Sequence, residues 1–159
     1  MKRGTKGFTL VEILIVVIIL GILAAIVIPQ FTQASAQARL SNLQTNIQTI
    51  RSQLLLYKTQ HNEAYPATSF STQMTTYSDI SGGTATSPDS THSYGPYLQA
   101  VPINPLSNSN AIRMVTGAAT AFSAPSTDAG WYFNSTTGEF RADLKDSWTT
   151  PDGSKYNAF

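Results

Sequence analysis

The chain has 159 residues, a formal net charge of +1 and no cysteine. Without cysteine there is no disulfide framework, thiolate metal site or thiol nucleophile, so the fold depends on apolar packing, assembly or a bound ion. The cations after residue 28 are dispersed, which argues against the basic stripe that nucleic-acid binding requires, and we predict no nucleic-acid partner.

The first 28 residues form a targeting segment. Residues 1–7 are short, polar and basic, and residues 8–28 are apolar at almost every position. An ordinary secretory signal has its small-residue cleavage site after the apolar stretch, whereas Gly7 stands before it. Cleavage after Gly7 would remove three cations and keep the apolar stretch as an anchor. These cations are Lys2, Arg3 and Lys6.

The apolar stretch, residues 8–28, is long enough to cross a membrane as a helix. At a rise of about 1.5 Å per residue it spans about 30 Å, the thickness of the apolar core of a bilayer. The positive-inside rule places the basic leader in the cytoplasm and the residues after Pro29 outside it. Without the three leader cations, seven Lys and Arg remain against nine Asp and Glu, so the exported part is mildly acidic.

Glu12 is the single charged residue in the apolar stretch. An ionised carboxylate near the centre of a membrane helix costs about 2.5–3.5 kcal/mol on insertion scales, and less near the membrane face. We therefore expect a cation to meet it, and the α-amine exposed by cutting the Gly7–Phe8 bond would be the nearest one. The alternative is a plain signal anchor, in which Glu12 only reaches towards the membrane interface.

The run Gly-Phe-Thr-Leu-Val-Glu from Gly7 to Glu12, with Gly21 and Pro29 following, resembles the N-terminus of type IV pilins and type II secretion pseudopilins. This resemblance implies that a prepilin peptidase cuts after Gly7 and methylates the new N-terminus at Phe8. It also implies that Glu12 neutralises the N-terminal amine of a neighbouring subunit and takes part in subunit assembly.

An apolar stripe predicts that the helix continues beyond the membrane to about Gln60. Its members recur at spacings of three and four residues, with polar residues between them, which is typical of one buried helical face. The stripe consists of Leu40, Leu43, Ile47, Ile50, Leu54 and Tyr57. It is too short for a coiled coil and lacks regular flanking charge pairs, so we expect it to pack within its own head.

Pro29 and Gly21 are the weak points of this long helix. Proline lacks the backbone N–H and crowds the preceding turn, so we expect Pro29 to kink the helix, with Gly21 as a second site of bending. The alternative is that Pro29 ends the membrane helix and that a second helix begins nearby.

The remaining residues, 61–159, are predicted to form a small folded head. Residues 62–95 suit a long polar loop with one short helical turn or strand, serving either as a flexible insertion or as a binding surface. Residues 97–105 contain two prolines and should be extended or turning. Short strands are predicted at residues 112–115, 131–133 and 139–142, the last two as a hairpin. The fold class is α+β, with the long N-terminal helix packed on a small antiparallel β-sheet.

The head shows no pattern typical of an enzyme. His61 and His92 each stand alone in a polar stretch and are predicted to lie at the surface. Nucleophile elbows, phosphate-binding glycine loops, dinucleotide fingerprints and zinc-protease motifs do not occur in the sequence. Trp131 and Tyr132 could stack on a ligand, but we favour packing against the helix that covers the sheet. We predict that the chain is not an enzyme.

Looser matches extend the resemblance to the major pseudopilins. They are Tyr-Pro after the stalk, Gly-Pro-Tyr-Leu with Pro-Ile-Asn-Pro, and Gly-Trp-Tyr-Phe-Asn with Thr-Gly-Glu-Phe. Residues 69–93 depart from it, and the lack of cysteine departs from those type IV pilins that close a C-terminal loop with a disulfide. Major pseudopilins often hold calcium near the C-terminus, and Asp143, Asp146 and Asp152 offer oxygen ligands. A solvated acidic tail is the alternative, and no metal site is assigned.

These features predict a filament subunit in four segments: a leader at residues 1–7, a transmembrane helix at 8–28, a stalk at 29–60 and a pilin-like head at 61–159. The leading interpretation is the major pseudopilin of a type II secretion system, which drives export of folded proteins. The alternatives are a type IV pilin of a surface pilus, for adhesion, twitching motility or DNA uptake, and a signal-anchored binding module that never polymerises.

The predicted location is the bacterial inner membrane, crossed once with the N-terminus cytoplasmic and the C-terminus periplasmic, followed by a periplasmic pseudopilus or a surface pilus. Expected partners are other copies of the chain, the prepilin peptidase, membrane lipid before assembly, the inner-membrane assembly platform and minor pseudopilins.

Overall fold

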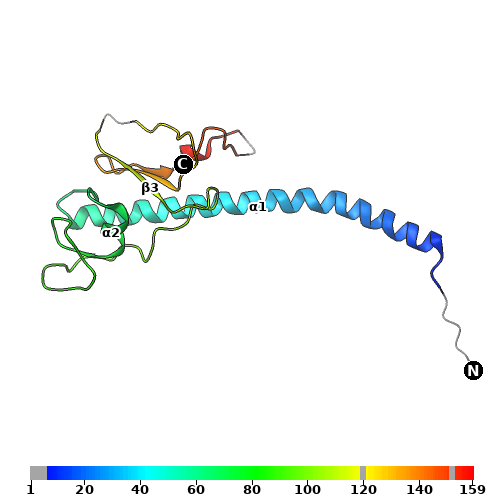
Figure 1. The fold of residues 1–159 in the computed structure, drawn as a ribbon, viewed down its shortest axis with the longest axis horizontal. Coiled ribbons are helices and arrows are strands. Elements are labelled where there is room, and N and C mark those ends of the chain that lie inside the picture. The colour runs from blue at the N-terminus through cyan, green and yellow to red at the C-terminus, as the bar shows by residue number, and fades with distance from the viewer. Residues whose placement is uncertain (1–6, 119–120, 151–152) are drawn as a thin grey trace, which may run out of the picture. The chain divides into compact units, whose positions relative to one another are not determined.

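The computed structural model describes residues 7–118, 121–150 and 153–159. Its main element is helix α1, Leu10–Gln60, drawn in blue to cyan in Figure 1. The chain divides into two compact units, one ending at Ala38 and the other comprising Arg39–Phe159, so the boundary falls inside α1. The part of the stalk after this boundary belongs to the unit that contains the head. The leader cations lie outside the described residues.

Helix α1 is continuous through Gly21 and Pro29. The alternative in which Pro29 ends one helix and a second begins nearby is therefore wrong, and the predicted end at Gln60 is confirmed. One proline removes a single backbone hydrogen bond, and the turns on either side maintain the helix across it. A kink at Gly21 or Pro29 stays a prediction.

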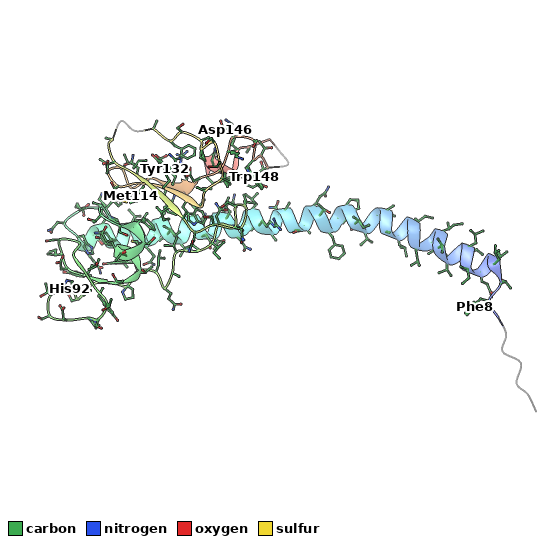
Figure 2. The ribbon with its side chains drawn as sticks, in the orientation of Figure 1. Phe8, His92, Met114, Tyr132, Asp146 and Trp148 are labelled. Atoms are coloured by element: carbon green, nitrogen blue, oxygen red, sulfur yellow. The ribbon has the colours of Figure 1, made fainter. Side chains whose placement is uncertain are left out.

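The N-terminal part of α1 has no cover within its own unit. Residues 7–35 are all exposed, and Figure 2 shows apolar side chains projecting on all sides of this part of the helix. Among the described residues, α1 is the one helix long and apolar enough to cross a membrane. A helix that is apolar all round is stable only when surrounded by lipid or by other helices, so this part requires cover that its own unit does not supply.

The C-terminal part of α1 buries one face in the head. Five members of the predicted stripe have at most 1% of their surface exposed, and Leu40 is partly buried against them. The five are Leu43, Ile47, Ile50, Leu54 and Tyr57. The stripe therefore packs within its own head, as predicted.

A three-stranded sheet packs on this stripe, and Figure 1 shows β3 beside the cyan part of α1. Its strands are β3 (Ile112–Val115), β4 (Trp131–Asn134) and β5 (Phe140–Ala142), in that spatial order. The predicted α+β class and the β4–β5 hairpin are confirmed, with β4 and β5 antiparallel. Strand β3, however, pairs with β4 in parallel. The long connection over residues 116–130 permits this, because parallel neighbours need a crossover of a dozen or more residues.

Strand β4 is buried on both of its faces. Trp131 and Phe133 join the core against α1, and the prediction for Trp131 is confirmed. Tyr132 is also fully buried, but it lies on the opposite face of the sheet. There the Phe122 ring meets it edge-on at 5.0 Å between centroids, and the Arg113 guanidinium lies 4.9 Å from its ring.

The polar region after the stalk is structured. It contains α2 (Phe70–Thr75), β1 (Tyr77–Ser78) and β2 (Thr84–Ala85). Gln73 ties it together: Oε1 accepts from the backbone of residues 68 and 69, and Nε2 donates to the Tyr57 hydroxyl and the Gly82 carbonyl at 3.1 and 2.9 Å. One short helical turn or strand was expected, and the region contains both a short helix and two short strands, anchored to the stalk through Tyr57.

His61 is buried, with only 2% of its surface exposed, so the prediction of a surface histidine is wrong. Its ring stacks on Tyr57 at 3.7 Å, with Nδ1 at 2.7 Å from the Tyr57 carbonyl and Nε2 at 2.9 Å from the Ser78 hydroxyl. A carbonyl can only accept, so Nδ1 carries the proton and donates. The helical spacing explains the burial, because residue 61 lies four positions after Tyr57 on the same face.

Candidate functional site

The Gly7–Phe8 bond lies before the start of α1 and is exposed. Phe8, labelled in Figure 2, has 84% of its surface exposed, and the helix begins at Leu10. A Cβ atom placed on Gly7 would meet nothing within 4 Å. The chain's own packing therefore does not require glycine here. A strict requirement for glycine would have to come from something outside these contacts.

Thr9 and Glu12 close the N-terminus of α1 as a capping box. Glu12 Oε2 accepts from the Thr9 backbone N–H at 2.8 Å and from the Thr9 hydroxyl at 2.9 Å. In return, the Glu12 N–H donates to the Thr9 hydroxyl oxygen at 3.2 Å. This reciprocal pattern satisfies backbone donors that the first turn of a helix otherwise leaves unpaired, and such caps contribute about 1 kcal/mol.

Thr9 is the residue that reasoning from the sequence missed. The signal was present, because Thr-Leu-Val-Glu places a hydroxyl and a carboxylate at the spacing of a capping box. The structure gives Glu12 a function within its own helix, in addition to the predicted role in subunit assembly.

Gly21 lies within the exposed part of α1, and a Cβ there would also meet nothing within 4 Å. Nothing within its own unit requires glycine at this position. A requirement for glycine at this position would have to come from neighbouring molecules, from lipid or from a bend in the helix.

Two of the three acids considered for calcium, Asp143 and Asp146, already have partners. Asp143 is fully buried and forms a bidentate ion pair with Arg113, with Oδ2–Nε at 2.7 Å and Oδ1–Nη2 at 2.5 Å. The hydrogen bond from Arg113 to this carboxylate raises the pKa of the arginine. Asp146 accepts from Lys155 and Asn157, and Asp152 lies outside the described residues. Over the described ranges, His, Asp and Glu residues form no group of three that could hold a metal.

The N-terminal segment matches a motif that is known from a class of proteins. Residues 2–28 match the model of the prokaryotic N-terminal methylation motif, which includes the exposed Gly7–Phe8 bond and the Thr9–Glu12 capping box. This is the motif of type IV pilin-like proteins. The resemblance predicted from the sequence is confirmed at this level.

Several relatives are similar to part of the chain. A type II secretion system core protein G from Pseudomonas aeruginosa is 46% identical over 67 residues, covering 42% of this chain and 46% of the relative. The type IV major pilin protein PilA of Myxococcus xanthus is 37% identical over 90 residues, covering 57% and 35%. A fimbrial protein of Neisseria meningitidis is 36% identical over 82 residues, covering 52% and 48%.

These matches span less than half the length of each of the three relatives. No solved structure matches the chain. The similarity therefore covers part of the chain and part of each relative, and the activity of the whole protein is a matter for proposal.

Proposed function

We propose that this chain is the structural subunit of a pilus-like filament, and specifically the major pseudopilin of a type II secretion system. One observation carries the proposal: an exposed, all-round apolar helix with the N-terminal methylation motif continues into a folded head. The similarity to core protein G of Pseudomonas aeruginosa supports the pseudopilin assignment.

The proposed order of events is set by the needs of the apolar helix. The subunit first lies in the inner membrane with its leader in the cytoplasm and its head in the periplasm, so that lipid covers the apolar side chains. A prepilin peptidase then cuts the exposed Gly7–Phe8 bond and methylates Phe8. During assembly, neighbouring helices replace the lipid, and apolar surface stays out of water throughout. The chain acts by being stacked and needs no catalytic group.

Glu12 is proposed to meet the new α-amine of a neighbouring subunit during this exchange. A charge-assisted hydrogen bond between the two would offset the cost of holding a carboxylate in apolar surroundings. Because both Thr9 bonds end on Oε2, pairing through Oε1 is compatible with the capping box. The same carboxylate could then order its own helix and fix the axial position of the next subunit.

A surface type IV pilin is the second candidate, and the similarity to the pilins of Myxococcus xanthus and Neisseria meningitidis favours it. Deleting the gene separates the two functions. Loss of secretion of folded proteins, with cell-surface fibres unchanged, supports the pseudopilin. Loss of surface-labelled fibres with normal secretion supports the pilin and overturns the pseudopilin assignment.

The Gly7→Leu variant tests processing. Because Gly7 has open space around it, the substitution should leave the fold intact and block the peptidase. We expect intact-mass measurement to find the full-length chain in the membrane, whereas a Gly4→Leu control is trimmed and methylated normally. Normal trimming of Gly7→Leu, with a methylated Phe8, would refute the proposed cleavage site.

The Glu12→Gln variant separates the two roles of Glu12. Glutamine can still form a capping box but carries no charge, so the helix start is kept while the ion pair is lost. We expect normal cleavage with filament yield reduced at least tenfold. A Thr9→Ser control, which keeps both the cap and the charge, should assemble normally. Wild-type filament yield from Glu12→Gln would exclude amine pairing as the role of this residue.

A further inference from the structure

The segment after β5 folds back on itself and ends in the short helix η1 (Tyr156–Ala158). Its turn is closed by hydrogen bonds from the Thr150 N–H to the Ser154 carbonyl and from the Gly153 N–H to the Thr150 carbonyl. Gly153 has a φ of +88°, a conformation that glycine adopts without strain. A backbone bridge between Thr149 and Lys155 continues this turn. The fold-back thus returns Lys155 to the neighbourhood of Asp146, which Figure 2 labels.

The Asp146 carboxylate and the Leu144 carbonyl accept hydrogen bonds from side-chain nitrogens in this segment. Lys155 Nζ lies 2.7 Å from Asp146 Oδ2, and Asn157 Nδ2 lies 2.9 Å from Asp146 Oδ1. The same Asn157 nitrogen lies 3.1 Å from the Leu144 carbonyl oxygen. One amide nitrogen therefore bridges a main-chain and a side-chain oxygen, while an ammonium group holds the other carboxylate oxygen.

The orientation of the Asn157 amide follows from its partners. Its Nδ2 faces two oxygens that can only accept, so the NH₂ group must point at them, and a flipped amide would set an oxygen against both. A calcium ion needs six to eight oxygen ligands, and a fixed NH₂ group is a donor that cannot be one of them. Asn157 is 4% exposed, so it has little freedom to turn away.

We propose that Lys155 supplies the cation and Asn157 the hydrogen-bond donor that hold this C-terminal segment together, so that it folds without calcium. Their nitrogens occupy the positions from which a divalent ion would otherwise draw Asp146 and the Leu144 carbonyl together. Hydrogen bonds from Lys155 and then from Asn157 lower the pKa of Asp146, consistent with a carboxylate already held by cationic and polar donors. Asp143 is likewise held by Arg113, so neither of these two acids is left for a shared ion.

Folding of this segment takes place within a single head and does not depend on filament assembly. Asp143 and Asp146 can be present near the C-terminus without forming a metal site. Asp143 and Asp146 each have a cationic partner from elsewhere in the sequence: Arg113 comes from β3, and Lys155 comes from the far side of the turn.

The test is thermal unfolding of the full chain in detergent, with EGTA or with about 5 mM Ca²⁺. This concentration exceeds the roughly 0.1–1 mM dissociation constants of extracellular calcium modules, and binding at such a site would raise the Tm by several degrees. We expect the two Tm values to agree within about 1 °C. A rise of several degrees with Ca²⁺, abolished by Asp152→Asn or by Asp146→Asn, would overturn the proposal.

Substitutions of Lys155 complete the test. Because the pair with Asp146 is exposed, Lys155→Met should lower the Tm by only about 1–4 °C, and Lys155→Arg, which keeps the charge, should recover most of that loss. Arg39→Met is the control, since the Arg39 side chain is a cation exposed on α1. It should change the Tm less than Lys155→Met. A Lys155→Met variant as stable as the wild type would overturn the structural role of Lys155.

Discussion

Both parts of α1 are rich in aliphatic residues, but only the C-terminal part buries them within the chain. In the N-terminal part apolar side chains cover every side, and Ile19 is 52% exposed within the chain. In the C-terminal part they form one stripe, and Ile47 is 1% exposed. Apolar residues on every side of a helix indicate that its partners are other molecules, whereas a stripe indicates that they belong to the same chain.

The same contrast extends to polar groups. At the N-terminus, Glu12 forms its hydrogen bonds with Thr9, three residues away. In the head, Gln73, Arg113 and Asp143 bind partners far away in the sequence. Local bonds order the end of a helix but do not fold a domain. The head is therefore expected to unfold cooperatively, and the apolar part of α1 to depend on lipid or neighbouring subunits.

Matched isoleucines test this contrast with the largest expected effect. Ile47→Ala removes buried methyl groups and leaves a cavity, so we expect the head to lose about 2–5 kcal/mol of unfolding free energy. Ile19→Ala, made in the exposed part of the same helix, should leave head stability unchanged. Chemical denaturation of the full chain in detergent, followed by Trp fluorescence, measures both. Equal losses from the two substitutions would contradict the division.

Much of this architecture was predictable because it depends on local periodicity. The apolar stretch, the stripe and the end of α1 follow from spacings of three and four residues, and the β4–β5 hairpin from a short turn-rich connection. The stripe even pointed to the burial of His61, one helical turn beyond Tyr57, but its polar surroundings in the sequence obscured that signal.

Interactions between distant residues could not be predicted. The sequence near β3 does not indicate that it pairs in parallel with β4, because the described residues of the crossover between them contain no helix. The pairing of Arg113 with Asp143, 30 residues away, depends on that register. At the candidate site, the positions Gly7, Phe8 and Glu12 came from a motif, and the structure adds the capping role of Thr9.

Arg113→Met tests whether the head depends on its distant ion pair. The substitution would leave the fully buried Asp143 carboxylate without its bidentate partner. We expect a loss of about 2–4 kcal/mol, below the roughly 3–5 kcal/mol of a fully buried pair because the Arg113 side chain is 36% exposed. The control is Arg39→Met, since the Arg39 side chain is exposed on α1. It should cost less than about 1 kcal/mol. Equal costs in urea denaturation would contradict this ranking.

Gln73→Leu tests the attachment of the polar region to the stalk. It removes four hydrogen bonds at once, including those to the Tyr57 hydroxyl and the Gly82 carbonyl. We expect a loss of about 1–3 kcal/mol, because buried polar groups are left without partners. Gln48→Leu, on the exposed face of α1, is the control and should be nearly neutral. Amide exchange should accelerate around α2 in Gln73→Leu, and unchanged exchange there would contradict its organising role.

The smallest expected effect concerns the loop around His92, which acid should loosen. Asp89 Oδ1 accepts from the backbone N–H groups of Thr91 and His92, both at 2.7 Å, and Oδ2 lies 2.9 Å from His92 Nδ1. Hydrogen bonding, led by the His92 N–H, lowers the pKa of Asp89 from its ordinary 3.8 to about 2. A lowered pKa means that ionised Asp89 stabilises the loop above about pH 4, and that this support is lost as the pH falls towards 2.

Amide chemical shifts of Thr91 and His92 across this range measure the loss, with an expected midpoint near pH 2. The Asp89→Asn variant is the matched control, because an amide oxygen can still accept both backbone bonds but does not titrate over this range. Its shifts should show no such midpoint. A wild-type midpoint near 3.8 would mean that the carboxylate is not engaged in solution. In that case the hydrogen bonds from Thr91 and His92 to Asp89 would not hold this loop in place.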